Sequence, residues 1–276
     1  MSCSECFQGH TRDGTPTGEV RKMFGRQTYV ATPSDKPVKG IVIIVPDAYG
    51  WEFVNNRLLA DHYASRGDLL VYLPDFMDGR PAPLWLLDVM PRVGETSTIW
   101  DWLWKPWYVA QLVYGVAPFF IYNSFGSAWP KIRSFFEAVR LHEVPERRIG
   151  AAGFCWGGRP VLALTHPDAK TADGKPLVDV VFTGHPSGLC LPGDARKVTK
   201  PVSVAIGDKD LVMPISQINV IKTTWQSLRD ISTEVVIYPG AGHGFCVRVD
   251  PNNENQYRQS QEAEEQALRW FGKYLG

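Results

Sequence analysis

The sequence has only five cysteines among its 276 residues (Cys3, Cys6, Cys155, Cys190 and Cys246). Apart from Cys3 and Cys6, they lie far from one another in the sequence. An odd number of widely scattered cysteines argues against a disulfide framework and for free thiols in a reducing compartment. A cysteine that stands in a distinctive local pattern is therefore a candidate for chemistry.

Charge of either sign is not in excess, because 29 Lys and Arg residues balance 29 Asp and Glu residues. With this balance, nothing in the composition suggests a nucleic-acid backbone or an acidic membrane surface as a partner. The first ten residues contain neither the basic region nor the apolar region of a secretory signal. We therefore expect a cytoplasmic protein that has no nucleic-acid partner.

Cofactor and metal signatures are also absent. There is no phosphate-binding loop or dinucleotide fingerprint. Cys3 and Cys6 with His10 could suggest zinc, but no second ligand pair follows, so we favour a flexible N-terminal arm. We expect no metal and no cofactor.

Strand and helix patterns alternate along the chain. The apolar runs 41–45 and 69–73 both end in Pro-Asp, and residues 55–66 between them have helical spacing, which predicts a β-α-β unit. Uninterrupted β-branched runs are typical of parallel strands covered on both faces. The sequence thus predicts a single α/β domain over residues 1–276 with a mostly parallel, doubly wound sheet. The further expected elements are strands 148–154, 178–183, 202–206 and 234–238 and helices 131–141, 158–165, 215–228 and 256–274.

An aromatic-rich segment interrupts this alternation between residues 81 and 129. It holds six of the ten tryptophans (Trp85, Trp100, Trp102, Trp104, Trp107 and Trp129). Its most apolar part, 107–122, is too short to span a bilayer unaided and contains Gly115 and Pro118. We interpret the segment as an inserted helical lid without stable membrane insertion; the alternatives are a peripheral core and a membrane-touching surface.

The cysteine in a distinctive pattern is Cys155, within Gly153-Phe-Cys-Trp-Gly157. This fits a nucleophile elbow, with cysteine in the serine position between a strand and a helix. Small residues are needed there because the turn is tight, and the helix N-terminus favours a thiolate. We therefore predict that Cys155 is a nucleophile.

Such an elbow takes an acid and then a histidine from loops further along the chain. Asp210 is the expected acid, with Asp208 as its competitor, and His243 lies in a glycine-rich loop after a predicted strand. His185 follows another strand and could line the pocket. His10, His62, His142 and His166 have the pattern of surface, helical, capping or packing positions.

An acyl-transfer reaction also needs donors for the oxyanion. In this geometry they are the amide after the nucleophile and one from the loop after an early strand. The candidates are Trp156 and Ala48, with Tyr49 as the alternative to Ala48.

These motifs together resemble the dienelactone hydrolase family, including its eukaryotic carboxymethylenebutenolidase-like branch. The resemblance rests on the segments 46–51, 73–76, 153–158, 207–214 and 243–248, in family order across most of the chain. It implies an α/β-hydrolase fold, a triad of Cys155, His243 and Asp210, and an acidic Asp47 that can contact the resting thiol. It also implies that Arg248 holds a substrate carboxylate.

The long aromatic insertion departs from compact family members and favours a larger, more aromatic ligand. We expect the substrate site to include Asp47, Tyr49, Arg248, Trp104 and Trp107. Arg80 and Arg159 are candidates for a second carboxylate-binding arginine.

The function expected from these residues is hydrolysis of a lactone or activated ester through an acyl-cysteine, by a monomer or homodimer. A thiolate is a good leaving group, so the enzyme should prefer esters whose leaving group is a stabilised enolate. The alternatives are a non-hydrolytic protein that binds an aromatic or polyketide-like molecule, and acyl transfer on the same residues.

Overall fold

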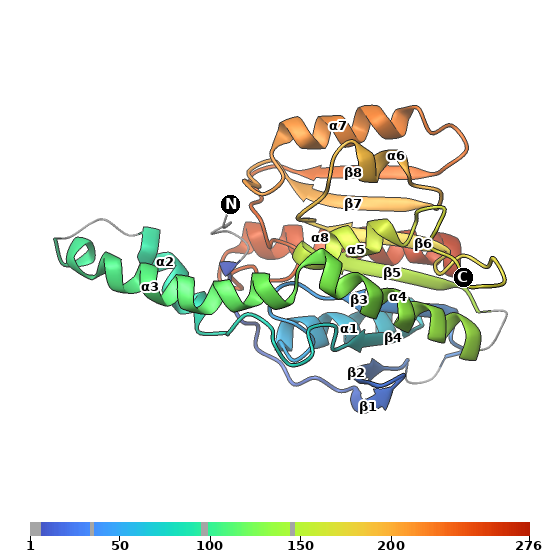
Figure 1. Cartoon of the computed structure of the whole chain (residues 1–276), viewed down its shortest axis with the longest axis horizontal. Coiled ribbons are helices and arrows are strands. Elements are labelled where there is room, and N and C mark those ends of the chain that lie inside the picture. Colours follow the sequence, from blue (N-terminus) through green and yellow to red (C-terminus); the bar gives the residue numbers. More distant parts are fainter. Residues whose placement is uncertain (1–6, 34–35, 95–98, 144–146) are drawn as a thin grey trace.

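The structure is a computed structural model, which describes residues 7–33, 36–94, 99–143 and 147–276. Its centre is an eight-stranded sheet in the order β1-β2-β4-β3-β5-β6-β7-β8 (Figure 1). Six neighbouring strands are parallel, whereas β1 and β2 pair antiparallel with each other and β2 pairs antiparallel with β4. The strands are β1 (Glu19–Met23), β2 (Arg26–Ala31), β3 (Gly40–Val45), β4 (Leu69–Pro74), β5 (Ile149–Phe154), β6 (Val180–Gly184), β7 (Val202–Gly207) and β8 (Thr233–Tyr238).

The central strands are apolar on both sides because helices cover both faces of the sheet. Along β3, Val42 and Ile44 face one core while Ile41 and Ile43 face the other, as the twofold side-chain alternation of a strand requires. The first core is closed by α1 (Val54–Gly67) and α8 (Glu254–Leu275), and the second by α4 (Phe125–His142), α5 (Gly158–Ala163) and α7 (Ile215–Gln226). A short α6 (Gly193–Arg196) precedes β7.

The aromatic segment forms two helices, α2 (Leu86–Gly94) and α3 (Ile99–Tyr122). Figure 1 shows that this helical hairpin projects away from the sheet. Only the C-terminal part of α3 reaches the core, through Val116 and Phe119. The insertion is therefore helical as expected, but much of it extends outward instead of lying over the body of the protein.

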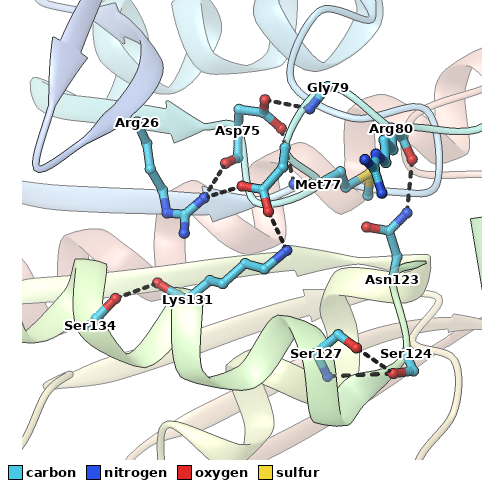
Figure 2. Close-up of polar contacts among 11 residues, drawn as sticks. Arg26, Asp75, Met77, Gly79, Arg80, Asn123, Ser124, Ser127, Lys131 and Ser134 are labelled. Carbon is cyan, nitrogen blue, oxygen red and sulfur yellow. Dashed lines mark hydrogen bonds and ion pairs between the residues drawn. The ribbon is translucent and has the colours of Figure 1, made fainter. Parts of the chain in front are cut away.

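Polar contacts fix the base of the hairpin where α3 meets α4 (Figure 2). The Asn123 side chain donates to the Arg80 carbonyl oxygen at 2.8 Å, and Ser124 caps the N-terminus of α4. Lys131 of α4 and Arg26 of β2 both bind Asp78, and their hydrogen bonds lower the pKa of that carboxyl although burial opposes the shift. The point where the insertion leaves the domain is therefore well anchored.

In the described ranges, no helix combines the length and hydropathy that crossing a membrane requires. The same ranges contain no cluster of His, Cys, Asp and Glu side chains suited to holding a metal ion. Cys3 and Cys6, considered above as zinc ligands, lie outside them.

Candidate active site

The turn that holds Cys155 joins β5 to the short helix η2 (Cys155–Gly157) and then α5. Cys155 has a φ of 50°, a strained conformation for a residue with a side chain. A Cβ on Gly157 would lie 2.0 Å from the Val45 carbonyl oxygen, and one on Gly153 would lie 2.4 Å from the Gly157 oxygen. The flanking glycines are therefore required because backbone of the neighbouring strand and turn occupies the space.

His243 and Asp210 converge on this turn from the loops after β8 and β7. His243 Nδ1 lies 2.9 Å from Asp210 Oδ2, and neither side chain is exposed to solvent. The other Asp210 oxygen accepts hydrogen bonds from the backbone amides of Val212 and Met213 at 2.8 and 3.0 Å. The carboxylate is thus fixed by its own loop and oriented toward the imidazole.

The imidazole also forms a hydrogen bond with Cys155. Burial lowers the pKa of His243, but the charge of Cys155, its hydrogen bond and that of Asp210 outweigh burial and raise this pKa to about 10. The raised pKa favours the protonated imidazole beside the sulfur, the arrangement of a thiolate-imidazolium pair.

The competing acid, Asp208, takes another role. Its Oδ1 accepts a hydrogen bond from the Gly240 amide at 2.7 Å, at an exposed site. It links the loop after β7 to the loop after β8. The structure therefore brings Asp210, and not Asp208, to the histidine.

The two residues considered as oxyanion donors follow the neighbouring strands β3 and β5. Ala48 is buried in the loop after β3, and its carbonyl accepts a hydrogen bond from the Ala82 amide. Trp156 follows Cys155, and its indole Nε1 donates to the Asn123 carbonyl at 2.7 Å. Through this bond the turn of the nucleophile candidate is tied to the base of the helical hairpin.

Asp47 and Arg248 form an ion pair whose side chains are both fully buried. The other Asp47 oxygen accepts from Asn56 Nδ2 and the Tyr49 amide. Burial lowers the pKa of Arg248, but the Asp47 and Cys155 charges outweigh it and raise the pKa. Asp47 thus holds one side of the guanidinium, which the resemblance had assigned to a substrate carboxylate. Arg248 also lines the cavity described below, and its Nη2 has no hydrogen-bond partner within the described part of the chain.

The N-terminal residues that precede β1 take part in the site, which the sequence did not indicate. Arg248 Nε donates to the Gln8 carbonyl at 2.8 Å, and the Tyr49 hydroxyl donates to the Phe7 carbonyl at 2.6 Å. Phe7 is buried between Tyr49 and the aromatic residues near the end of α3. From Phe7 onward the expectation of a flexible arm is wrong, because backbone hydrogen bonds and aromatic packing hold this segment against the domain.

His185 lies directly beside the histidine of the site. Its ring is fully buried and perpendicular to that of His243, with centroids 5.0 Å apart. Burial, with the nearby positive charges of His243 and Arg248, keeps the pKa of His185 well below its usual value. The sequence suggested that His185 could line the pocket. The structure places its ring next to His243, where protein encloses it.

A cavity of about 1060 Å³ opens next to His243. Its walls come from the N-terminal segment, α2, the loop after β8 and the beginning of α8 (Gln8, Gly9, Leu87, Asp88, Arg92, His243, Phe245, Arg248 and Gln256 among them). Cys155 is only 1% exposed and is not among the residues that line this cavity. Arg92 of α2 also lines the cavity. No sequence pattern indicated this, because the path of the insertion brings Arg92 to the cavity.

Trp104 and Trp107, expected to contact the substrate, do not line this cavity. Both lie on α3, more than half exposed, and line shallow clefts between α2 and α3. The physical reason is the outward course of α3, whose N-terminal part projects away from the sheet (Figure 1). Arg80 and Arg159 are also engaged elsewhere, over the rings of Tyr122 and Phe125.

Comparison with known proteins identifies the family of the chain. Residues 27–275 match the sequence pattern of the dienelactone hydrolase family. The chain belongs to the dienelactone hydrolase family. Dienelactone hydrolases act on ester or lactone bonds, so the protein is a hydrolase of this type.

Similar proteins of this family include fungal and animal members. The chain is 28% identical to "Hydrolase pyvD" of Aspergillus violaceofuscus, covering 98% of this chain and 96% of the relative. It is 23% identical to a carboxymethylenebutenolidase homolog of Rattus norvegicus over the same shares. A putative dienelactone hydrolase structure from Klebsiella pneumoniae superimposes with a TM-score of 0.61 at 17% identity, covering 90% of this chain and 93% of that one. This last similarity shows that the fold is shared.

Proposed function

We propose that the protein hydrolyses a lactone or activated ester through a covalent acyl-cysteine intermediate, with Cys155 as nucleophile, His243 as acid and base, and Asp210 as the residue that orients His243. The observation that carries the proposal is the connected series of contacts from Asp210 through His243 to Cys155 at a strained turn.

In the first step the Cys155 sulfur attacks the carbonyl carbon, and electrons of the carbonyl bond move to its oxygen. The backbone amides of Ala48 and Trp156 are the proposed donors to this oxyanion. When the carbonyl re-forms, the carbon-oxygen bond of the ester breaks, and the leaving oxygen takes the proton from the His243 imidazolium. The products of this step are a thioester on Cys155 and an alcohol or enol, which stays attached when the substrate is a lactone.

In the second step a water molecule attacks the thioester. His243, now neutral, accepts a proton from this water and Cys155 leaves as a thiolate, which restores the resting ion pair. Because a thiolate leaves readily, the first tetrahedral intermediate of a simple alkyl ester returns to substrate. A stabilised enolate competes better with the thiolate, which favours enol lactones and aryl esters as substrates.

The cavity restricts the substrate further. Arg92 and Asp88 place charges of opposite sign in a space large enough for an aromatic acid or lactone, and Arg248, paired with Asp47, lines the same space. Since Cys155 is covered, a substrate must displace the side chains beside His243 before its carbonyl carbon reaches the sulfur.

The test is a pre-steady-state measurement with an activated aryl ester. The wild-type protein should release one equivalent of phenolate per enzyme in a burst, and Cys155→Ala should show no burst. Cys246→Ala is the matched control, since this second buried thiol lies outside the proposed machinery. A burst that survives in Cys155→Ala, or disappears only in Cys246→Ala, would contradict the proposal.

A further inference from the structure

The outer surface of α3 is unusually apolar for a helix that projects from its domain. Asp101 and Lys105 are the only charged residues among its 24. Between Trp100 and Ile121, eight tryptophan, tyrosine and aliphatic residues are 55% to 78% exposed. An apolar strip of this length on a soluble domain is typical of an interaction site.

A regular spacing distinguishes part of this surface. Seven exposed residues follow one another at alternating intervals of three and four, which places them along one stripe of the helix (Trp100, Leu103, Trp107, Ala110, Tyr114, Ala117 and Ile121). No charged residue interrupts the stripe, which we call the α3 seam. Such a heptad spacing is typical of a helix that pairs with another helix along its length.

Residue sizes along the α3 seam alternate in the way that helix pairing requires. One set of positions holds the bulky Trp100, Trp107, Tyr114 and Ile121, and the intervening set holds Leu103 followed by the small Ala110 and Ala117. A hollow of about 590 Å³ opens over Ala110, bounded by Trp85, Trp107 and Tyr114. A bulky side chain of another helix would fit there as a knob fits a hole.

We propose that a second copy of this chain binds the α3 seam, with the two α3 helices antiparallel about a twofold axis. In an antiparallel pair of identical helices, each set faces the other set of the second copy. With Trp107 of one chain opposite Ala110 of its partner, Trp100 would lie opposite Ala117 and Tyr114 opposite Leu103, so both tryptophans of the seam would face alanine. A twofold axis repeats each contact, so one surface satisfies both partners.

The length of the helix agrees with this occupant. A 24-residue helix is roughly 36 Å long, so pairing along it buries on the order of 1,000 Å² in total, near the lower end for a specific interface. A lipid surface is the less favoured occupant. Helices that lie on membranes carry a basic face, whereas Lys105 is the only basic residue of α3, and lipid contact does not call for alternating large and small residues.

The pairing would also affect the proposed substrate cavity through α2. Trp85 borders the hollow over Ala110 and also lines the cavity at His243, while Asp88 and Arg92 line both that cavity and the second cleft between α2 and α3. A partner helix on the seam would therefore support the wall of the cavity from outside. The dimer itself depends on no assumption about the catalytic chemistry.

The experiment is sedimentation velocity of the full chain and of two single variants. Ala110→Glu places a charge in the seam, and Val109→Glu places the same charge at an exposed neighbour outside it. We expect the wild type and Val109→Glu to be dimers at about 10 μM. Ala110→Glu should weaken the dimer on the order of 100-fold or more, because its carboxylate would be buried without a partner. Circular dichroism should show the same helix content in all three.

Two results would overturn the proposal. One is a wild-type protein that stays monomeric, including a monomer that sediments with phosphatidylcholine vesicles, since this would assign the surface to lipid. The other is a dimer that Ala110→Glu and Val109→Glu leave equally intact, because the interface would then lie elsewhere.

Discussion

His243 Nδ1 lies 2.9 Å from Asp210 Oδ2 in a space closed to solvent, while the neighbouring Asp208 binds a backbone amide at the surface. Two carboxylates only two residues apart thus have different surroundings. The backbone amides of Val212 and Met213 determine which of them faces the imidazole.

Replacing Asp210 by Asn should lower turnover of an aryl ester about 10² to 10⁴-fold, because the imidazole loses the acceptor that fixes its tautomer and stabilises its positive charge. Asp208→Asn should stay within a few-fold of the wild type, since it affects only a loop contact. Steady-state kinetics of the two purified variants checks this. Equal losses of turnover in both variants would show that the contact between Asp210 and His243 does not identify the residue that orients the imidazole.

The raised pKa of His243 predicts the pH dependence of thiol reactivity. With an imidazolium persisting to about pH 10, alkylation of Cys155 by iodoacetamide should change little between about pH 7 and pH 9. An ordinary thiol would react about tenfold faster per pH unit until its pKa of about 8.5. The rate is best followed in a Cys190→Ala background, because Cys190 is an exposed free thiol.

The same shift has a consequence for stability. A histidine whose pKa is raised on folding stabilises the folded state fully below its unfolded pKa of about 6.5, and this contribution is lost as the pH rises through about 10. In Asp210→Asn the pKa of His243 falls, so the loss should occur at lower pH. Urea unfolding of both proteins across this range measures the difference, and identical pH profiles would contradict the assignment of Asp210 as a cause of the shift.

Much of the fold could be predicted because its signals are local. Continuous apolar runs mark the parallel strands, and helix 55–66 was expected within a residue of α1 at each end. The β1-β2 hairpin was missed because β1 is mostly exposed and β2 carries polar residues, so neither has the pattern of a covered strand. Helix α4 begins six residues earlier than expected, since its cap at Ser124 follows directly on the aromatic segment.

The candidate site could be predicted only where a motif places one residue at the end of a strand. Cys155, His243 and Asp210 each follow a strand, and parallel strands bring their carboxyl ends to one edge of the sheet. The contributions of Phe7, Gln8 and Arg92 depend on where long connections pass over that edge. Asp47 and Arg248 were both noted, but their ion pair joins residues 201 positions apart, which no local pattern indicates.

The tight turn at Cys155 can be tested through Gly157. Gly157→Ala should destabilise the protein by about 3 kcal/mol, or roughly 6 to 12 °C in Tm, because the added methyl group would meet the Val45 carbonyl at 2.0 Å. Gly272→Ala in α8 is the control, since its Cβ would have no neighbour within 4 Å and alanine favours a helix. Thermal unfolding should show a loss for the first variant only; an unchanged Tm in Gly157→Ala would refute the steric explanation.

The last prediction concerns the buried ion pair between Asp47 and Arg248. Asp47→Asn should cost about 3 to 5 kcal/mol of stability, because it leaves a guanidinium enclosed without its counter-charge. Arg248→Met should also destabilise, since Asp47 is then the unpaired charge. The double variant, in which neither charge is buried, should be more stable than the sum of the two losses predicts, by about 1 to 3 kcal/mol. Urea unfolding of the four proteins gives this interaction energy. Strict additivity of the two losses would mean that the two side chains are not coupled in solution. The position of Arg248 would then depend on its hydrogen bond to the Gln8 carbonyl oxygen and not on Asp47.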